Sequence, residues 1–170
     1  IFVATTPAVF IGFTLRHNIE NLFESVNSVG FALLFTGLVL ILSSIFNNKN
    51  SKHSLFSSII IGFGQALAII PGISRSGMTI TLSLFFGFSP KESAKFSFLL
   101  SIPVITGAGV LGIQNIQSTE IFSFDIIIAA LLSSFFVGII ALRVLIKLLQ
   151  LGKFYIFGIY CICLGLVSIF

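Results

Sequence analysis

Long uncharged, apolar segments alternate with short polar ones along almost the whole chain. Residues 25–48 carry no charge and are long enough to cross a hydrocarbon core of about 30 Å, which takes about 20 helical residues. The pattern predicts an all-α, polytopic integral membrane protein with a single membrane domain. Its helices are expected over residues 1–15, 28–46, 55–88, 96–113, 126–147 and 154–170.

The composition strengthens this interpretation. The chain is 56% hydrophobic and 8% charged, with a mean hydropathy of +1.17, whereas about 25% of the residues of a soluble domain are charged. Its net charge of +4 lies in short loops between apolar segments. We therefore interpret the charge as a topology signal and expect the bilayer, not nucleic acid, as the partner.

The segment 55–88 is interrupted near its middle. Pro71 lacks a backbone N–H and disfavours helix at the residue before it, and Gly72 follows directly. We expect one helix over 54–70 and a second over 77–88, which at 1.5 Å per residue is only about 18 Å long. Since the second arm is too short to cross a membrane, the segment is predicted to be a re-entrant hairpin that returns to its starting side. Broken backbone at that depth must be buried in protein or line a cavity.

The distribution of charge agrees with a hairpin that returns. One face would then carry seven of the nine basic residues, namely Lys49, Lys52, Lys91, Lys95, Arg143, Lys147 and Lys153. The opposite face would carry Arg16 and the acids Glu20, Glu24, Glu120 and Asp125. The positive-inside rule places the basic face in the cytoplasm and the C-terminus outside.

Arg75 is the only charged residue between Lys52 and Lys91. A charge at membrane depth costs at least about 2.5 kcal/mol, so such a residue is a functional hypothesis by default. Its planar guanidinium suits phosphate oxygens. The alternative is a structural break whose arginine pairs with a buried acid or a lipid headgroup.

The residues around Arg75 point to the same chemistry. A helix that begins after a break presents free N–H groups and a positive dipole end to an anion. Glycines let the backbone approach a ligand, and hydroxyl groups donate to it. The candidate substrate-binding residues are Gly72, Gly77, Thr79 and Gln65, and the candidate catalytic residues are Arg75, Ser74 and Ser76. Together they predict a site that holds a phosphoryl group and stabilises charge during its transfer.

The remaining polar residues give weaker signals. Gln65 is the amide inside the first arm of the hairpin, where it either lines the cavity or bonds to a neighbouring helix. His17 and His53 are interpreted as loop residues. Cys161 and Cys163 point to different faces of a helix, so we expect neither a disulfide nor a metal site.

Two stretches carry a resemblance to a known family. Residues 71–79 read Pro-Gly-Ile-Ser-Arg-Ser-Gly-Met-Thr, and residues 96–103 read Phe-Ser-Phe-Leu-Leu-Ser-Ile-Pro. With Gln-Ala-Leu-Ala at 65–68, the chain closely resembles the undecaprenyl-diphosphate phosphatases of the bacitracin-resistance type over essentially its whole length.

The resemblance implies a function and a fold. It implies hydrolysis of undecaprenyl diphosphate to the monophosphate, which recycles the carrier lipid for cell-wall synthesis. Arg75 would bind the diphosphate, and Ser74, Ser76 and Thr79 would line the same pocket. The implied fold is an inverted repeat with two re-entrant hairpins in the bacterial plasma membrane, opening to the outer face. Family members are generally stimulated by a divalent cation, Mg²⁺ or Ca²⁺, and a homodimer is left open.

One family motif is absent from the chain. The family has an earlier glutamate-rich helix followed by a Pro-x-Ser-Ser-x-Gly-His turn, which supplies carboxylates and a histidine. The chain corresponds to roughly the C-terminal two-thirds of a family member and to its second hairpin. We therefore expect an N-terminally incomplete protein that is inactive as it stands.

Three other functional classes are alternatives to a diphosphate phosphatase. A transporter or flippase for a phospholipid or small anion also uses broken helices at mid-membrane. A phosphatidic-acid-type phosphatase needs a histidine and an acid soon after the Ser-Arg pair, and residues 76–90 contain neither. A purely structural membrane subunit is the remaining alternative.

Overall fold

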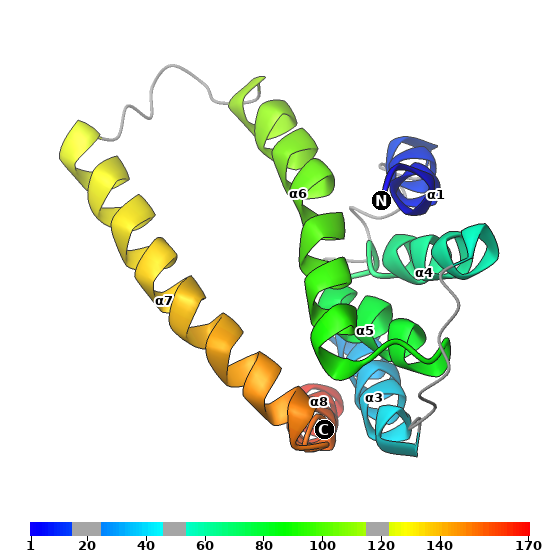
Figure 1. Cartoon of the computed structure of the whole chain (residues 1–170). Coiled ribbons are helices and arrows are strands. Elements are labelled where there is room, and N and C mark those ends of the chain that lie inside the picture. Colours follow the sequence, from blue (N-terminus) through cyan, green and yellow to red (C-terminus); the bar gives the residue numbers. More distant parts are fainter. Residues whose placement is uncertain (15–24, 46–53, 115–122) are drawn as a thin grey trace.

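The structure, a computed structural model, describes residues 1–14, 25–45, 54–114 and 123–170. These residues form helices and no strands: α1 (Phe2–Thr14), α3 (Val26–Leu42), the 3-10 helix η1 (Ser43–Ile45), α4 (Leu55–Leu67), α5 (Arg75–Phe85), α6 (Pro90–Gln114), α7 (Phe124–Gln150) and α8 (Tyr155–Ile169) (Figure 1). The predicted all-α class is confirmed for this part of the chain. Residues that the sequence analysis discussed outside it are Arg16, His17, Glu20, Glu24, Lys49, Lys52, His53 and Glu120.

Three helical segments have the length and apolar composition to cross a membrane. They are Val26–Ile45, Pro90–Val110 and Phe124–Gln150. The shorter apolar helices are Phe2–Gly12, Leu55–Leu67 and Tyr155–Ile169. Many large apolar side chains on these helices are exposed, as expected of helices that meet lipid instead of water.

Helices α3 and α8 pack closely through two pairs of glycines. A Cβ atom on Gly37 would lie 2.7 Å from the carbonyl oxygen of Gly158, and one on Gly165 would lie 2.8 Å from that of Gly30. The two glycines of each helix are seven residues apart, or about two helical turns, so both pairs meet when the helices run antiparallel. Small residues at such contacts let transmembrane helices approach until their backbones touch.

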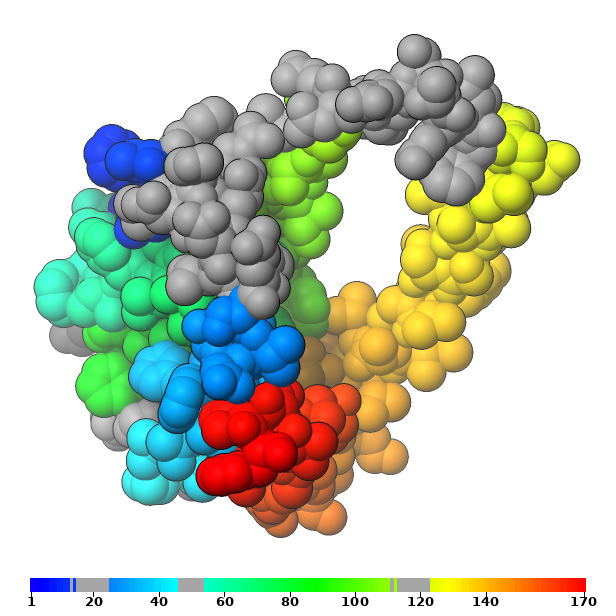
Figure 2. Space-filling model, turned by 180° about the vertical axis from the view of Figure 1, so that it is seen from behind, coloured from blue at the N-terminus to red at the C-terminus, as the bar shows by residue number. Residues whose placement is uncertain are grey.

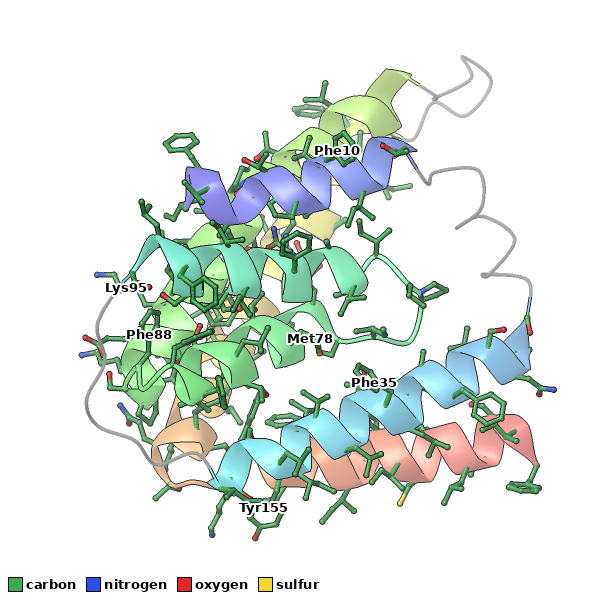
Figure 3. The ribbon with its side chains drawn as sticks, turned by 90° about the vertical axis from the view of Figure 1, so that its right-hand side faces the viewer. Phe10, Phe35, Met78, Phe88, Lys95 and Tyr155 are labelled. Carbon is green, nitrogen blue, oxygen red and sulfur yellow. The ribbon has the colours of Figure 1, made fainter. Side chains whose placement is uncertain are left out.

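The broken segment folds into two arms that lie side by side. Helix α4 ends at Leu67 and α5 begins at Arg75, and the two run antiparallel from the turn that joins them (Figure 3). The predicted break at Pro71 and Gly72 therefore falls inside this turn. The arms differ from the expected ranges 54–70 and 77–88, because α4 ends three residues early and α5 begins at Arg75, two residues before Gly77.

Helix α1 lies against α4, and α6 passes along α5. A Cβ atom on Gly62 of α4 would lie 2.5 Å from the carbonyl oxygen of Ala4, so this contact also depends on a small residue. Helix α7 differs from the others. It stands apart from the rest of the molecule over most of its length, and no residue of its most apolar stretch is buried (Figure 2).

The basic residues of the long helices gather at one end of the molecule, where the acid Glu92 in the first turn of α6 also lies. The beginning of α6 and the end of α7 lie at the same end of the molecule (Figure 1). Lys91 and Lys95 belong to the first, and Arg143 and Lys147 to the second, whereas Asp125 lies in the first turn of α7 at the opposite end. Lys95 also lies away from the turn between α4 and α5 (Figure 3).

The glycine contacts generate a stability prediction. Gly37→Leu places a side chain where the backbone of α8 lies, and overpacking of this kind costs about 1–3 kcal/mol. We expect a correspondingly lower thermal midpoint when unfolding of the chain in detergent is followed by circular dichroism. Gly138→Leu is the matched control, because a Cβ atom at Gly138 of α7 meets nothing within 4 Å. Equal losses in the two variants would contradict the prediction.

Candidate functional site

The turn between α4 and α5 is fitted against α3. Gly72 has a φ of +94°, a conformation that favours glycine. A Cβ atom there would lie 2.6 Å from the carbonyl oxygen of Val29 and 2.8 Å from the Cβ of Ala32. Both the backbone conformation and the available space therefore require glycine at this position.

A buried hydroxyl on α3 holds the turn in place. Thr36, which is 1% exposed, donates its Oγ1 hydrogen to the carbonyl of Gly72 at 2.9 Å. The same oxygen accepts the backbone N–H of Ser74 at 3.1 Å. Two backbone groups of the broken segment are thus satisfied by one side chain. Thr36 was not among the predicted site residues. The sequence shows it only as a hydroxyl residue beside Gly37 in an apolar span, which does not indicate that it contacts the turn.

Ser74 starts α5. It is the N-cap, and its Oγ accepts the N–H of Gly77 at 3.1 Å while its carbonyl accepts the N–H of Met78 at 2.9 Å. A Cβ atom on Gly77 would lie 2.9 Å from this Oγ, so the cap and the glycine fit together closely. In a helix capped in this way, the N–H groups of the next two residues, Arg75 and Ser76, have no intrahelical acceptor. They form the positive end of the α5 dipole.

The Arg75 side chain is half-buried at the start of α5. Within the described residues its hydrogen bond runs from Nη2 to the carbonyl oxygen of Ser101 on α6, at 3.4 Å. This is a long contact, and it engages one of the five donors that a guanidinium carries. The others are available to an anion.

Gln65, on the last turns of α4, is 2% exposed. Among the residues that the structure describes, neither its amide nitrogen nor its amide oxygen has a hydrogen-bond partner. Burying such a group without a partner costs about 1–3 kcal/mol, so an unpaired amide calls for a specific explanation.

Gln65 and Arg75 line the same cavity, which has a volume of about 770 Å³. This volume lies within the range of about 300–1,000 Å³ that ligand pockets span. The other residues of the lining come from α1, the end of α4 with the turn, and α6: Ala8, Val9, Gly12, Ala68, Ile69, Pro103, Val104, Thr106, Gly107, Ala108 and Val110. The cavity is therefore apolar with a few polar groups, and its one charge is positive.

Thr79 lies deeper than the sequence analysis assumed. It is fully buried, and its Oγ1 lies 2.7 Å from Oγ of Ser97 on α6 and donates to the carbonyl of Arg75 at 3.0 Å. These contacts fasten α5 to α6 directly behind Arg75. In the sequence, Ser97 is one residue of the motif at 96–103. Its position along the chain does not show that it bonds to Thr79.

The chain matches a known protein family over nearly its whole length. Residues 1–167 match the family described as bacitracin resistance protein BacA. The chain belongs to this family.

Relatives named undecaprenyl-diphosphatase match nearly all of this BacA-family chain. The protein of Halothermothrix orenii is 40% identical over 175 residues, covering 99% of the chain and 67% of that protein. The protein of Methanococcus maripaludis strain C7 is 40% identical, covering 95% of the chain and 64% of that protein. That of Methanothermobacter thermautotrophicus is 39% identical, covering 98% of the chain and 96% of that protein. The chain thus spans about two thirds of the first two relatives and nearly all of the third.

The predicted site residues of this BacA chain fall into two groups. Gln65 and Arg75 line the cavity. The others shape the start of α5 or lie behind it, and Ser76 is half-buried outside the lining residues. The ligand-binding roles of Ser74, Ser76 and Thr79 stay predictions.

The cavity's donors do not fit a resident divalent cation. Mg²⁺ and Ca²⁺ take oxygen ligands, mainly carboxylates, carbonyls and water. The lining offers an amide oxygen from Gln65 and a hydroxyl from Thr106 beside the positive charge of Arg75. Among the described residues, no group of three or more His, Cys, Asp or Glu could hold a metal ion.

The Thr36 bridge can be tested by removing its hydroxyl. Thr36→Val keeps the shape but leaves two part-buried backbone groups without their partner, at a cost of at most about 1–3 kcal/mol for each group left unsatisfied. We expect a lower unfolding free energy and faster amide exchange at Ser74, measured by hydrogen exchange. Thr36→Ser keeps the hydroxyl and serves as the control. Unchanged exchange at Ser74 in Thr36→Val would count against the bridge.

Proposed function

We propose that this BacA-family protein binds undecaprenyl diphosphate with its diphosphate against Arg75 and Gln65, and that it hydrolyses this lipid to undecaprenyl phosphate and inorganic phosphate. The reaction recycles a carrier lipid for cell-wall synthesis, which relates it to bacitracin resistance. The observation that carries the proposal is the buried, unpartnered Gln65 amide in a cavity that also holds Arg75.

The chemistry of the cavity suits a diphosphate. The guanidinium of Arg75 offers paired donors to phosphate oxygens, and the N–H groups at the start of α5 add a second set. Gln65 can donate from its amide nitrogen. In the reaction water forms a bond to the terminal phosphorus while the bond from that phosphorus to the bridging oxygen breaks, and the prenyl monophosphate leaves. Donors fixed around the phosphoryl oxygens stabilise the charge that develops.

The basic residues gathered at one end support a placement in the membrane. Helix α4 starts and α5 ends towards the side where Lys95 lies, and their joining turn lies away from it (Figure 3). A re-entrant α4–α5 hairpin entering from the cytoplasmic side of a bacterial plasma membrane follows from the positive-inside rule. The fold would be one part of an inverted repeat, with the site opening to the outer face. A divalent cation would reach it on the diphosphate oxygens, since Mg²⁺ is commonly held by substrate phosphates.

Replacing Arg75 tests the binding step. Arg75→Ala removes hydrogen bonds to a charged group, each worth about 1.5–3 kcal/mol, so we expect the affinity for undecaprenyl diphosphate to fall roughly 10- to 100-fold. Binding is measured with the purified chain in nanodiscs. Arg143→Ala, an exposed cation of α7 outside the cavity lining, is the control. Equal affinity in wild type and Arg75→Ala would contradict the proposal.

Phosphate release separates the reaction from transport. Because the chain by itself is expected to be inactive, release is measured on a protein that also carries the family's glutamate-rich helix and Pro-x-Ser-Ser-x-Gly-His turn. Release of inorganic phosphate by that protein, lost in Arg75→Ala, supports hydrolysis. Movement of the lipid across liposome membranes without phosphate release would favour a transporter.

Gln65→Leu is predicted to raise the stability of the protein and to lower its affinity for diphosphate. Replacing the unpaired amide by an apolar side chain of similar size removes the cost of its burial, about 1–3 kcal/mol, so the empty protein should unfold at a higher temperature. The same change should weaken diphosphate binding, because a donor to the ligand is lost. Circular dichroism and equilibrium binding measure the two effects. A destabilised variant with unchanged affinity would show that the amide serves the fold alone.

A further inference from the structure

The cavity has two chemically different parts. Its amide and its guanidinium, from Gln65 and Arg75, come from the α4–α5 hairpin. The opposite walls come from α1 and α6 and are apolar or small, with Thr106 as the exception. A ligand that fills both parts carries a charged head and an apolar tail.

The apolar part reaches the lipid-facing surface of the molecule. Val9 of α1 and Val110 of α6 line the cavity and are 47% and 53% exposed. In a bilayer their exposed surfaces meet acyl chains. A chain leaving the cavity between α1 and α6 would therefore enter the hydrocarbon core directly, without crossing water.

The α6 wall is lined by unusually small residues at one level. Gly107 and Ala108 are neighbours in the lining. A Cβ atom on Gly107 would meet nothing within 4 Å, so no packing contact within the described residues requires glycine there. A larger side chain at Gly107 would take up room in the cavity without displacing protein atoms.

We propose that Gly107 is a specificity-determining residue, which keeps the apolar part of the cavity wide enough for the first isoprene units of a prenyl diphosphate. This inference rests on the proposed function. A pocket of about 770 Å³ is the size that encloses a drug-sized ligand, so a C55 lipid places only its head and first units inside. Since the tail comes from lipid that is equally apolar, its units add to the affinity through van der Waals packing against the cavity walls. The remaining units lie in the bilayer.

The chain supplies a matched pair of positions for the test. Gly109 lies two residues further along α6, and a Cβ atom there also meets nothing within 4 Å, yet Gly109 is not among the residues that line the cavity. Gly107→Leu and Gly109→Leu thus add the same side chain to the same helix. Gly107→Ala provides a smaller step at the lining position.

The experiment measures equilibrium binding of farnesyl diphosphate and of inorganic diphosphate to the whole chain in nanodiscs. We expect Gly107→Leu to weaken farnesyl diphosphate binding at least tenfold and Gly107→Ala to weaken it less. Inorganic diphosphate should bind Gly107→Leu within twofold of wild type, which also shows that the variant is folded. Gly109→Leu should change neither affinity by more than twofold.

Each other outcome decides against the inference. Unchanged farnesyl diphosphate binding in Gly107→Leu, or an equal loss in Gly109→Leu, overturns it and leaves the proposed function standing. Weaker binding of both farnesyl diphosphate and inorganic diphosphate to Gly107→Leu also overturns it, because the substitution would then act on the diphosphate site and not on the part of the cavity that holds the prenyl tail. Absence of binding of either ligand to wild type overturns the proposed function together with this inference.

Discussion

The hydrogen bonds of Thr36 are the interaction on which the site depends. Its hydroxyl bonds to the carbonyl of Gly72 and the N–H of Ser74 at once, where the broken backbone has no helical partners. Thr36 in turn keeps its place because its neighbour Gly37 brings α3 into backbone contact with α8. The glycine contacts thus fix α3, α3 fixes the turn, and the turn sets where α5 and Arg75 begin. A residue of α8 can affect the site through this sequence of contacts without touching a ligand.

Two side chains of the cavity, those of Arg75 and Gln65, have hydrogen-bond donors that the described residues leave unused, and such donors favour an anion. The half-buried charge of Arg75 and the buried amide of Gln65 each lose hydration on folding, and neither recovers it fully from the described protein groups. Ser74 and Thr79 of the hairpin and Thr36 of α3 have their hydroxyls bonded, whereas the buried hydroxyl of Thr81 on α5 has no partner among the described residues. Gln65 and Arg75 differ from Thr81 in that they line the cavity, where a ligand can supply the missing hydrogen bonds. This division distinguishes residues that build the site from residues that contact what binds there.

Much of this arrangement could be predicted from local sequence. Uncharged length predicted the helices, proline and glycine predicted the break, and a lone arginine at that break predicted the position of the charge. What could not be predicted depends on pairing between distant segments. Thr36 looked like one more hydroxyl in an apolar span, and Thr79 looked like a ligand because α5 alone does not reveal that Ser97 faces it. The seven-residue spacing of glycines in α3 and in α8 was a usable signal, but it becomes informative only when the two helices are considered together.

The length of α7 sets a depth in the membrane. Its 27 residues span about 40 Å, more than a hydrocarbon core of about 30 Å. Arg143 and Lys147 occupy its last two turns, where long basic side chains reach for the headgroup layer. That layer therefore also receives the short connection through Gly152 to the start of α8. Helix α8 packs against α3 through the two glycine pairs described above. The depth of the basic end of α7 in the bilayer therefore also sets the depth at which Thr36, and with it the turn, lies below the membrane surface.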